Sequence, residues 1–216
     1  MSDTEETTQA EQPATQKKRK QLTAEEKEQN RRIAQYKKSL NKFILTSRFN
    51  NNTAQQNREY RERTNTGCIY CSPTQVSQTV PVDAITFVLE MNNETNQIMG
   101  IGLIKNHPIV GKYSVYREHN YNRYVFIGKT RIDRSQMNEQ EEAIMKALDT
   151  LCFKGMSNIK RANGLKQFPV AMQYKMLGII NLVDFISNMF KQRMQKEKEK
   201  SNTSETIKQS NKQTIK

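Results

Sequence analysis

Apolar and polar positions alternate most regularly between residues 84 and 134, which contain most of the strand-like sequence of the chain. The alternation over residues 85–91 resumes over residues 97–104 after a polar turn, a pattern that predicts a β-hairpin. In residues 97–104 both alternating sets are apolar or glycine, so we expect a strand buried on both faces, as in a central strand or a barrel wall. Gly100 and Gly102 fall on one face, where they leave room for a neighbouring element, a bend or a ligand.

A second hairpin is predicted where residues 113–116 and 122–129 flank a polar turn. Tyrosines are interleaved there with basic residues, a combination that stacks bases and holds phosphates on a sheet or barrel face. The same composition also arises without a ligand, because tyrosines favour strands and arginines solvate sheet edges. The candidate nucleic-acid-binding residues of this region are Tyr116, Arg117, Tyr121, Arg123, Tyr124, Lys129 and Arg131.

An amphipathic helix is predicted near the start of the chain. A capping box at Thr23 opens it, and the apolar stripe of residues 24–47 has a helical period, so we expect this stripe to dock on another element. The opposite side is basic and includes Arg31 and Arg32, which either solvate the helix or contact phosphates. Residues 50–66 have no periodicity and predict a linker or a frayed extension of this helix.

Two further helices are predicted downstream, and together with the strands they indicate an α+β fold. Asn138 caps a helix over residues 138–153, and Pro169 is well placed as the first residue of a helix that runs to about residue 196. We expect them to pack on a small, mostly antiparallel sheet or partial barrel of four or slightly more strands. The predicted organisation is a disordered tail with a basic run (1–22), a basic helix and linker (23–66), a globular domain (67–190) and a basic disordered tail (191–216).

The positive charge of the chain lies mainly outside the predicted globular domain. The net charge is +13, but residues 67–190 carry 13 basic and 10 acidic residues, whereas residues 17–66 carry 14 and 5. Contact with a polyanion is therefore expected to begin with the flanks. A short basic run can be a nuclear localisation signal, a phosphate-binding patch or a solvated stretch before a helix. These candidate residues are Lys17, Lys18, Arg19 and Lys20, together with Lys160 and Arg161 in a basic loop.

Cys68 and Cys71 have the Cys-x-x-Cys spacing that lets two thiolates reach one zinc ion from a tight turn. A structural zinc site needs four ligands, and only Cys152, His107 and His119 remain as scattered candidates. Zinc binding, a redox dithiol and a plain turn with small apolar thiols all remain open. With three cysteines in the chain, we expect reduced thiols rather than a disulfide framework.

Catalytic motifs are missing from the sequence: there is no Gly-x-Ser-x-Gly, no Walker sequence and no His-Glu-x-x-His. A metal-dependent nuclease remains an alternative, because carboxylates on strands can hold magnesium near a scissile phosphate. Glu90 is the acid to test, with Asp83, Glu94, Glu118 or Asp133 as its possible companions.

Four segments together resemble an uncharacterised protein family of large nucleocytoplasmic DNA viruses: GCIYCSP from residue 67, VLEMNNETNQIMGIG from residue 88, YNRYVFIGK from residue 121 and LCFKG from residue 151. The resemblance covers residues 67–168 and excludes both arms. It implies a host-cell cytoplasm, nucleus or virus-factory setting and brings no assigned activity. Separately, two compact hairpins with a glycine-rich strand look like a PUA- or EVE-type barrel that binds RNA or modified bases.

The leading functional prediction is a non-enzymatic accessory protein that binds nucleic acid. The basic arms would supply salt-sensitive affinity, and the tyrosine-rich hairpin would supply base contacts. The first alternative is a virion or assembly protein that binds other proteins through apolar helix stripes. No apolar run is long enough to span a bilayer, and the first residues do not resemble a signal peptide. We therefore expect an intracellular protein that does not bind a membrane.

Overall fold

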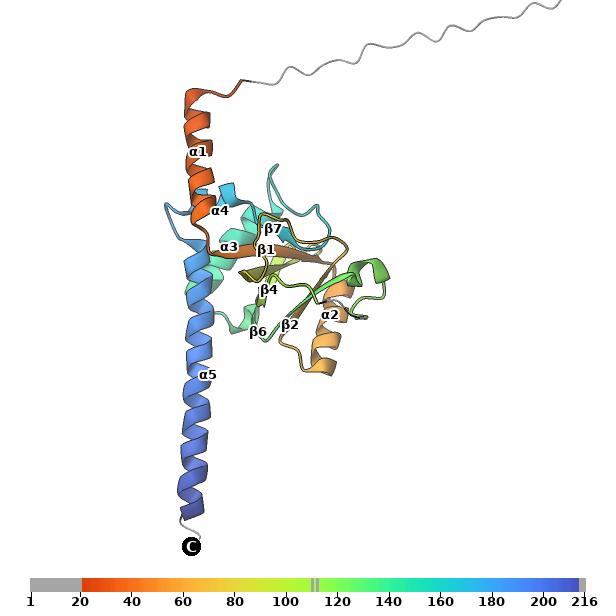
Figure 1. Ribbon diagram of the computed structural model, residues 1–216, viewed down its shortest axis with the longest axis vertical. Helices are drawn as coiled ribbons and strands as arrows, with labels where there is room; N and C mark the ends of the chain where they lie inside the picture. The colour runs from red at the N-terminus through yellow and green to blue at the C-terminus, as the bar shows by residue number, and fades with distance from the viewer. Residues whose placement is uncertain (1–20, 110, 112, 214–216) are drawn as a thin grey trace, which may run out of the picture.

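A central sheet flanked on both faces organises the chain (Figure 1). The computed structural model describes residues 21–213 except 110 and 112, and beyond residue 199 it describes the backbone alone. The α+β class is confirmed, because the described residues form five α-helices, a mixed five-stranded sheet and a separate two-stranded ribbon. The sheet does not close into a barrel.

The five-stranded sheet has the order β6-β4-β3-β1-β7. The central strand β3 pairs with β1 in parallel, and the other three pairs of neighbouring strands are antiparallel. The predicted hairpin of residues 85–104 is confirmed as β3 and β4, with a register shift between Glu90 and Met91. The strands are β1 (Lys42–Phe49), β3 (Ile85–Asn92), β4 (Gln97–Lys105), β6 (Thr130–Asp133) and β7 (Lys166–Gln167).

One face of the sheet is covered by helices. The predicted helix at 138–153 is confirmed as α3 (Glu139–Phe153), where Asn138 and Glu141 form the reciprocal capping box. The predicted helix from Pro169 to about residue 196 is divided into α4 (Val170–Met176) and α5 (Leu182–Gln213). The separate start of α5 is marked by Asn181, whose side-chain oxygen accepts a hydrogen bond from the backbone N–H of Asp184 at 3.4 Å.

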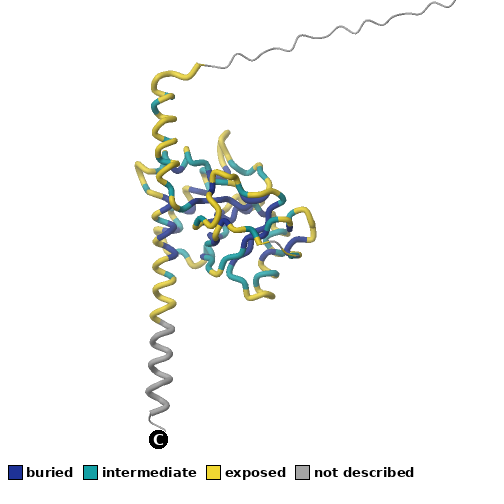
Figure 2. The backbone as a smooth tube through the Cα atoms, viewed as in Figure 1, coloured by how far each residue is buried: buried dark blue, intermediate teal, exposed yellow. Residues whose placement is uncertain are grey.

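The opposite face is covered by α2 (Asn51–Thr64) and by a ribbon of β2 (Cys68–Ser72) paired with β5 (Tyr124–Gly128). The sheet therefore has two separate apolar cores, one against α3, α4 and α5 and one against α2 and the ribbon. Figure 2 shows that the buried backbone is concentrated between these layers.

The prediction of one helix over residues 24–47 is wrong beyond Ser39. The helix α1 (Ala24–Ser39) ends before β1 begins at Lys42. Five consecutive residues of β1 are buried, because this strand is inside the sheet and packs against both cores. The folded unit thus includes residues 42–64, which the predicted domain boundary at residue 67 left out.

Residues 50–66, predicted to be a linker or a frayed extension, contain the separate helix α2. Asn50 caps it by accepting from the backbone N–H of Thr53 at 2.7 Å, while Thr53 accepts from the backbone of Asn50. The chain leaves α2 through Asn65, which adopts a left-handed conformation with φ of 50°.

The second predicted hairpin is wrong. β5 pairs with β2 and not with residues 113–116, which form no strand. The side chain of Asn122 explains the loop, because its amide oxygen accepts from the backbone N–H groups of Val115 and Tyr116 and its NH₂ donates to the carbonyl of Tyr116. A polar side chain takes the hydrogen bonds that a partner strand would otherwise provide.

The two ends of the described chain extend away from the sheet (Figure 1). α1 has no buried residue and makes its main contact with α4. The C-terminal segment predicted to be disordered continues α5 as far as Gln213. The predicted tail at 1–22 lies outside the described residues apart from its last two. Within the described part, no helix has the length and apolar character required to cross a membrane.

Candidate functional site

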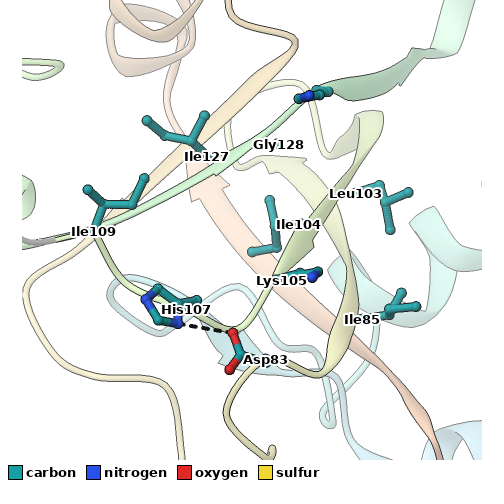
Figure 3. A pocket seen from close by; sticks show the side chains of 10 residues that line it. Asp83, Ile85, Leu103, Ile104, Lys105, His107, Ile109, Ile127 and Gly128 are labelled. Atoms are coloured by element: carbon teal, nitrogen blue, oxygen red, sulfur yellow. Dashed lines mark hydrogen bonds and ion pairs between the residues drawn. The ribbon is translucent and has the colours of Figure 1, made fainter.

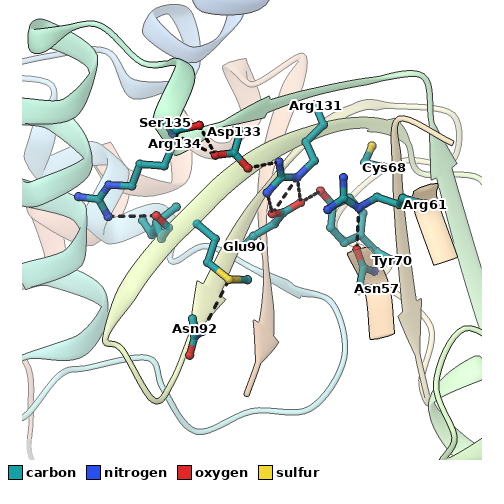
Figure 4. Close-up of polar contacts among 12 residues, drawn as sticks. Asn57, Arg61, Cys68, Tyr70, Glu90, Asn92, Arg131, Asp133, Arg134 and Ser135 are labelled. Carbon is teal, nitrogen blue, oxygen red and sulfur yellow. Dashed lines mark hydrogen bonds and ion pairs between the residues drawn. The ribbon is translucent and has the colours of Figure 1, made fainter. Parts of the chain in front are cut away.

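A buried ionic cluster lies between the central sheet and α2 (Figure 4). Glu90 of β3 points to this side with only 4% of its side chain exposed. Its carboxylate accepts hydrogen bonds from the Tyr70 hydroxyl at 2.7 Å and from Arg131 Nη2 at 2.6 Å. Arg131 also pairs through Nη1 with Asp133 at 2.7 Å. We call these four residues the Glu90 cluster.

The two glycines of β4 create the space for this cluster. A Cβ atom on Gly100 would meet the guanidinium of Arg131, and one on Gly102 would meet the ring of Tyr70. The room that the sequence predicted above these glycines is therefore filled by two side chains of the protein itself.

The protonation states of the cluster follow from its burial. Desolvation, followed by the charge of Glu90, raises the pKa of Tyr70 well above its usual value, so the phenol remains a donor. Burial alone would lower the pKa of Arg131, but Glu90 more than offsets this and raises it. Burial opposes the ionisation of Asp133, yet its hydrogen bond from Arg131 holds its pKa at about 2. At neutral pH, Tyr70 is therefore neutral, whereas Arg131 and Asp133 are charged.

This geometry does not favour Glu90 as a nuclease carboxylate, because both of its oxygens accept hydrogen bonds from Arg131. Asp83, one of its possible companions, instead pairs with His107 at 3.0 Å. Among the described residues, no three His, Cys, Asp or Glu side chains gather in a way that could hold a metal ion.

A basic cleft opens beside the cluster, between α2 and the sheet edge. Its inner part, of about 140 Å³, is lined by three residues of α2 (Asn57, Arg58 and Arg61) together with Glu90, Arg131 and Asp133. An outer part of about 290 Å³ shares Arg61, Arg131 and Asp133 and extends to Lys129 and to Glu197 of α5. We call both parts together the α2 cleft.

The cations of the α2 cleft differ in how they are held. Arg61 Nε donates to the side-chain oxygen of Asn57 at 3.0 Å, and Arg131 is fixed by Glu90. Arg58 and Lys129 are exposed, and within residues 21–199 neither forms an ion pair. The charge of Arg131 is already balanced by Glu90 and Asp133, so Arg58, Arg61 and Lys129 are the cations that can accept an oxyanion such as phosphate.

The predicted tyrosine surface is not assembled. Tyr116 is 7% exposed, and its hydroxyl accepts a hydrogen bond from Asn57 Nδ2 at 3.0 Å, so its ring belongs to the core. Tyr121 and Tyr124 are half-buried against the same core, and Arg123 lies over the Tyr124 ring. Tyr116 therefore has no face available to a base.

The remaining predicted basic residues lie apart from the α2 cleft, with Lys129 and Arg131 as the exceptions. Arg31 and Arg32 pair with Glu28 on exposed α1. Lys160 donates to Asn96 at 2.7 Å in the loop that also carries exposed Arg161. Arg117 is exposed near α2, where its backbone N–H donates to Gln56. Lys17, Lys18, Arg19 and Lys20 lie outside the described residues.

Cys68 and Cys71 belong to strand β2 and not to a turn. Three residues apart on a strand, they point to opposite faces and do not converge on one ion. Burial raises the pKa of each thiol to about 12, so both are protonated at neutral pH. This arrangement does not fit the shared zinc site that their spacing suggested. All three cysteines are free thiols, as expected.

A second, apolar cleft of about 730 Å³ lies at the end of the sheet (Figure 3). Ile85, Leu103, Ile109 and Ile127 contribute its aliphatic walls. Lys129 lines this cleft as well as the α2 cleft, so the two sites adjoin.

Arg58 and Arg61 were not predicted as site residues, because residues 50–66 have too few apolar positions to show a helical stripe. The signal that could have revealed them is the Asn50-x-x-Thr53 cap followed by arginines three positions apart, which share one helix face. No family model, curated protein or solved structure matches this chain. The function must therefore be argued from the site itself.

Proposed function

We propose that this protein is a nucleic-acid-binding accessory protein that holds backbone phosphates in the α2 cleft. The observation that carries the proposal is the placement of exposed Arg58 and Lys129 beside Arg61 in one cleft. Arginine forks match the geometry of phosphate oxygens, and a cleft that gathers several of them exceeds what isolated surface charges provide.

The basic flanks support the same function through long-range attraction. The chain carries a net charge of +13, most of it outside residues 67–190. A phosphate-rich polymer would be attracted by these flanks and then positioned by the α2 cleft. This proposal keeps the predicted role of the basic arms. It assigns the specific contacts to the α2 cleft, which binds phosphates, and no longer to the tyrosine-rich hairpin.

A charge-reversal experiment tests the cleft. The double variant Arg58→Glu/Arg61→Glu is compared with Lys146→Glu/Lys175→Glu, which changes the net charge equally on exposed positions of α3 and α4. Fluorescence anisotropy with labelled oligonucleotides across a salt series should show at least roughly tenfold weaker binding for the α2 variant and a salt slope reduced by about two. The control should lose much less.

Two outcomes would contradict the proposal. If the wild-type chain binds neither DNA nor RNA at low salt, nucleic-acid binding itself is wrong. If both charge-reversed proteins weaken equally, binding follows net charge and the α2 cleft is not its site. Replacing Lys17, Lys18, Arg19 and Lys20 by Gln would then measure the separate contribution of the N-terminal arm.

One observation favours protein assembly as a second candidate. α1 extends from the body, and its half-buried Tyr36 packs against Tyr174 of α4 at 5.8 Å between ring centroids. Ile179, close to this contact in the chain, is 88% exposed. Light scattering of the protein without nucleic acid tests this candidate, which requires a stable oligomer that Ile179→Asp disrupts.

A further inference from the structure

The apolar cleft exists because one strand leaves the sheet early. β6 pairs with β4 only along Gly100–Leu103, whereas β4 continues to Lys105. β6 follows directly on β5, and at Lys129 the chain passes from β5, which pairs with β2 in the other layer, into β6. The end of β4 is therefore left beside an open cleft, bounded on the far side by Ile109 and Ile127 (Figure 3).

Aliphatic side chains from separate segments surround this cleft. Ile85 is 42% exposed and Ile109 is 37% exposed. Large apolar side chains that are exposed next to one another are a feature of binding surfaces. The volume of about 730 Å³ is within the range of ligand sites. Polar groups lie at its edge. His107 Nδ1 lies 3.0 Å from an oxygen of Asp83, and Lys105, the last residue of β4, also lines the cleft.

Lys129 joins the apolar cleft to the basic one. It lines the apolar cleft together with Gly128 and the α2 cleft together with Arg61 and Arg131. A ligand that spans both needs an apolar, flat group on one side of Lys129 and anionic groups on the other. A nucleotide within a single strand has this division, since its base is an apolar plate with polar edges and its phosphate is an anion.

We propose that the apolar cleft accepts an unpaired base of a single-stranded nucleic acid whose phosphates lie in the α2 cleft. This inference rests on the proposed function and specifies its substrate as single-stranded rather than duplex. In a duplex, bases are stacked and paired, so none can enter the cleft without first being extruded. Asp83 and His107 lie where the polar edge of the base would be read.

The test compares strands that differ only in their bases. The full-length protein is titrated with labelled single strands of about 10 nucleotides, with abasic strands of the same length, and with a duplex. The wild-type protein should bind the base-bearing strand about tenfold more tightly than the abasic strand, because the aliphatic walls of the cleft remove the face of the base from water.

Neutral variants then locate the effect. Ile85→Gln/Ile109→Gln should weaken binding of the base-bearing strand about tenfold and leave binding of the abasic strand unchanged. The matched control Leu22→Gln/Met156→Gln replaces two exposed apolar residues outside the cleft, and it should change neither. In the wild-type protein, 2-aminopurine within the strand should become brighter on binding as it leaves the stack, a readout that requires no variant.

The possible failures are distinguishable. If base-bearing and abasic strands bind equally to the wild-type protein, the base pocket is wrong while phosphate binding in the α2 cleft stands. If neither strand binds, the proposed function fails and this inference fails with it. If the protein is a dimer that Ile85→Gln/Ile109→Gln dissociates, the cleft is an interface between two copies, which also overturns the inference.

Discussion

The two faces of the five-stranded sheet are covered in different ways. Against α3 and α5 the core is aliphatic and aromatic, with Leu148 and Phe87 among its buried residues, and the ion pair of Glu141 with Arg193 joins the two helices beside it. Against α2 and the ribbon, an apolar core of similar extent surrounds the Glu90 ion pair, and both clefts open on the margins of this layer.

The difference separates stability from binding. An apolar face gains most from complete closure, because stabilisation follows the apolar area removed from water. A buried ion pair adds little net stability compared with apolar residues of similar size, but it fixes the position of the groups that it contains. On the α2 side the cost of burying Glu90 is thus compensated by an oriented Arg131 at the wall of a cleft.

The largest expected effect is on the α2 face, from Arg131→Met. This change leaves the carboxylate of Glu90 buried without its cation, and we expect the free energy of unfolding to fall by about 3–5 kcal/mol. Urea denaturation followed by circular dichroism measures the loss. Combining the change with Glu90→Gln removes the unpaired charge and should restore more than half of it.

Arg134→Met is the matched control for that experiment. Arg134 also pairs with two carboxylates, but those of Glu142 and Asp149 are 30% and 15% exposed, so water can replace the lost cation in part. Its loss should be clearly smaller. Equal losses at Arg131 and Arg134 would mean that burial of the Glu90 pair has no special energetic role.

On the helical face, Leu148→Ala should reduce the free energy of unfolding by about 2–5 kcal/mol, because it leaves a cavity against the sheet. Because Leu148 does not line the α2 cleft, the variant that remains folded should bind nucleic acid with unchanged affinity. Anisotropy measured well below the denaturation midpoint checks this. A large change in affinity would show that the helical face is not purely structural.

The elements that could be predicted from the sequence are those with local signals. The hairpin of β3 and β4 follows from alternation around one turn, and α3 follows from its cap and its apolar stripe. β1 was hidden because Phe43 and Ile44 continue the helical period of the preceding residues. Its true pairing is with β3, about 40 residues away in the chain, and no local pattern encodes that contact.

The candidate site shows the same limit. Glu90, Gly100, Gly102 and Arg131 were each singled out by their type and position. Their assembly into one cluster could not be predicted, because Glu90 and Arg131 are 41 residues apart in the chain. The positions of Arg58 and Arg61 depended further on recognising α2, a helix with only one buried residue.

A smaller effect is expected from Gly102→Ala. The added methyl group would meet the Tyr70 ring within the Glu90 cluster, and such overpacking costs about 1–3 kcal/mol. Gly178→Ala is the control, because a Cβ there meets no atom within 4 Å. Denaturation midpoints compare the two. If Gly102→Ala is as stable as the control, the close approach of Tyr70 is not a constraint on this face.

The smallest effect concerns the rim of the same cluster, at Asp133. Its pKa is about 2 in the folded protein against an ordinary 3.8, so the folded state binds fewer protons than the unfolded state between these values. The stabilisation from Asp133 is therefore complete above about pH 5 and is lost as the pH falls through 4 towards 2. Because 46% of the side chain is exposed, solvent screening keeps this stabilisation below about 1 kcal/mol.

Urea midpoints of the wild type and Asp133→Asn, measured from pH 5 down to pH 2, should differ most at pH 5 and converge at the acid end. A constant difference across this range would show that the ionised carboxylate is not what Arg131 holds.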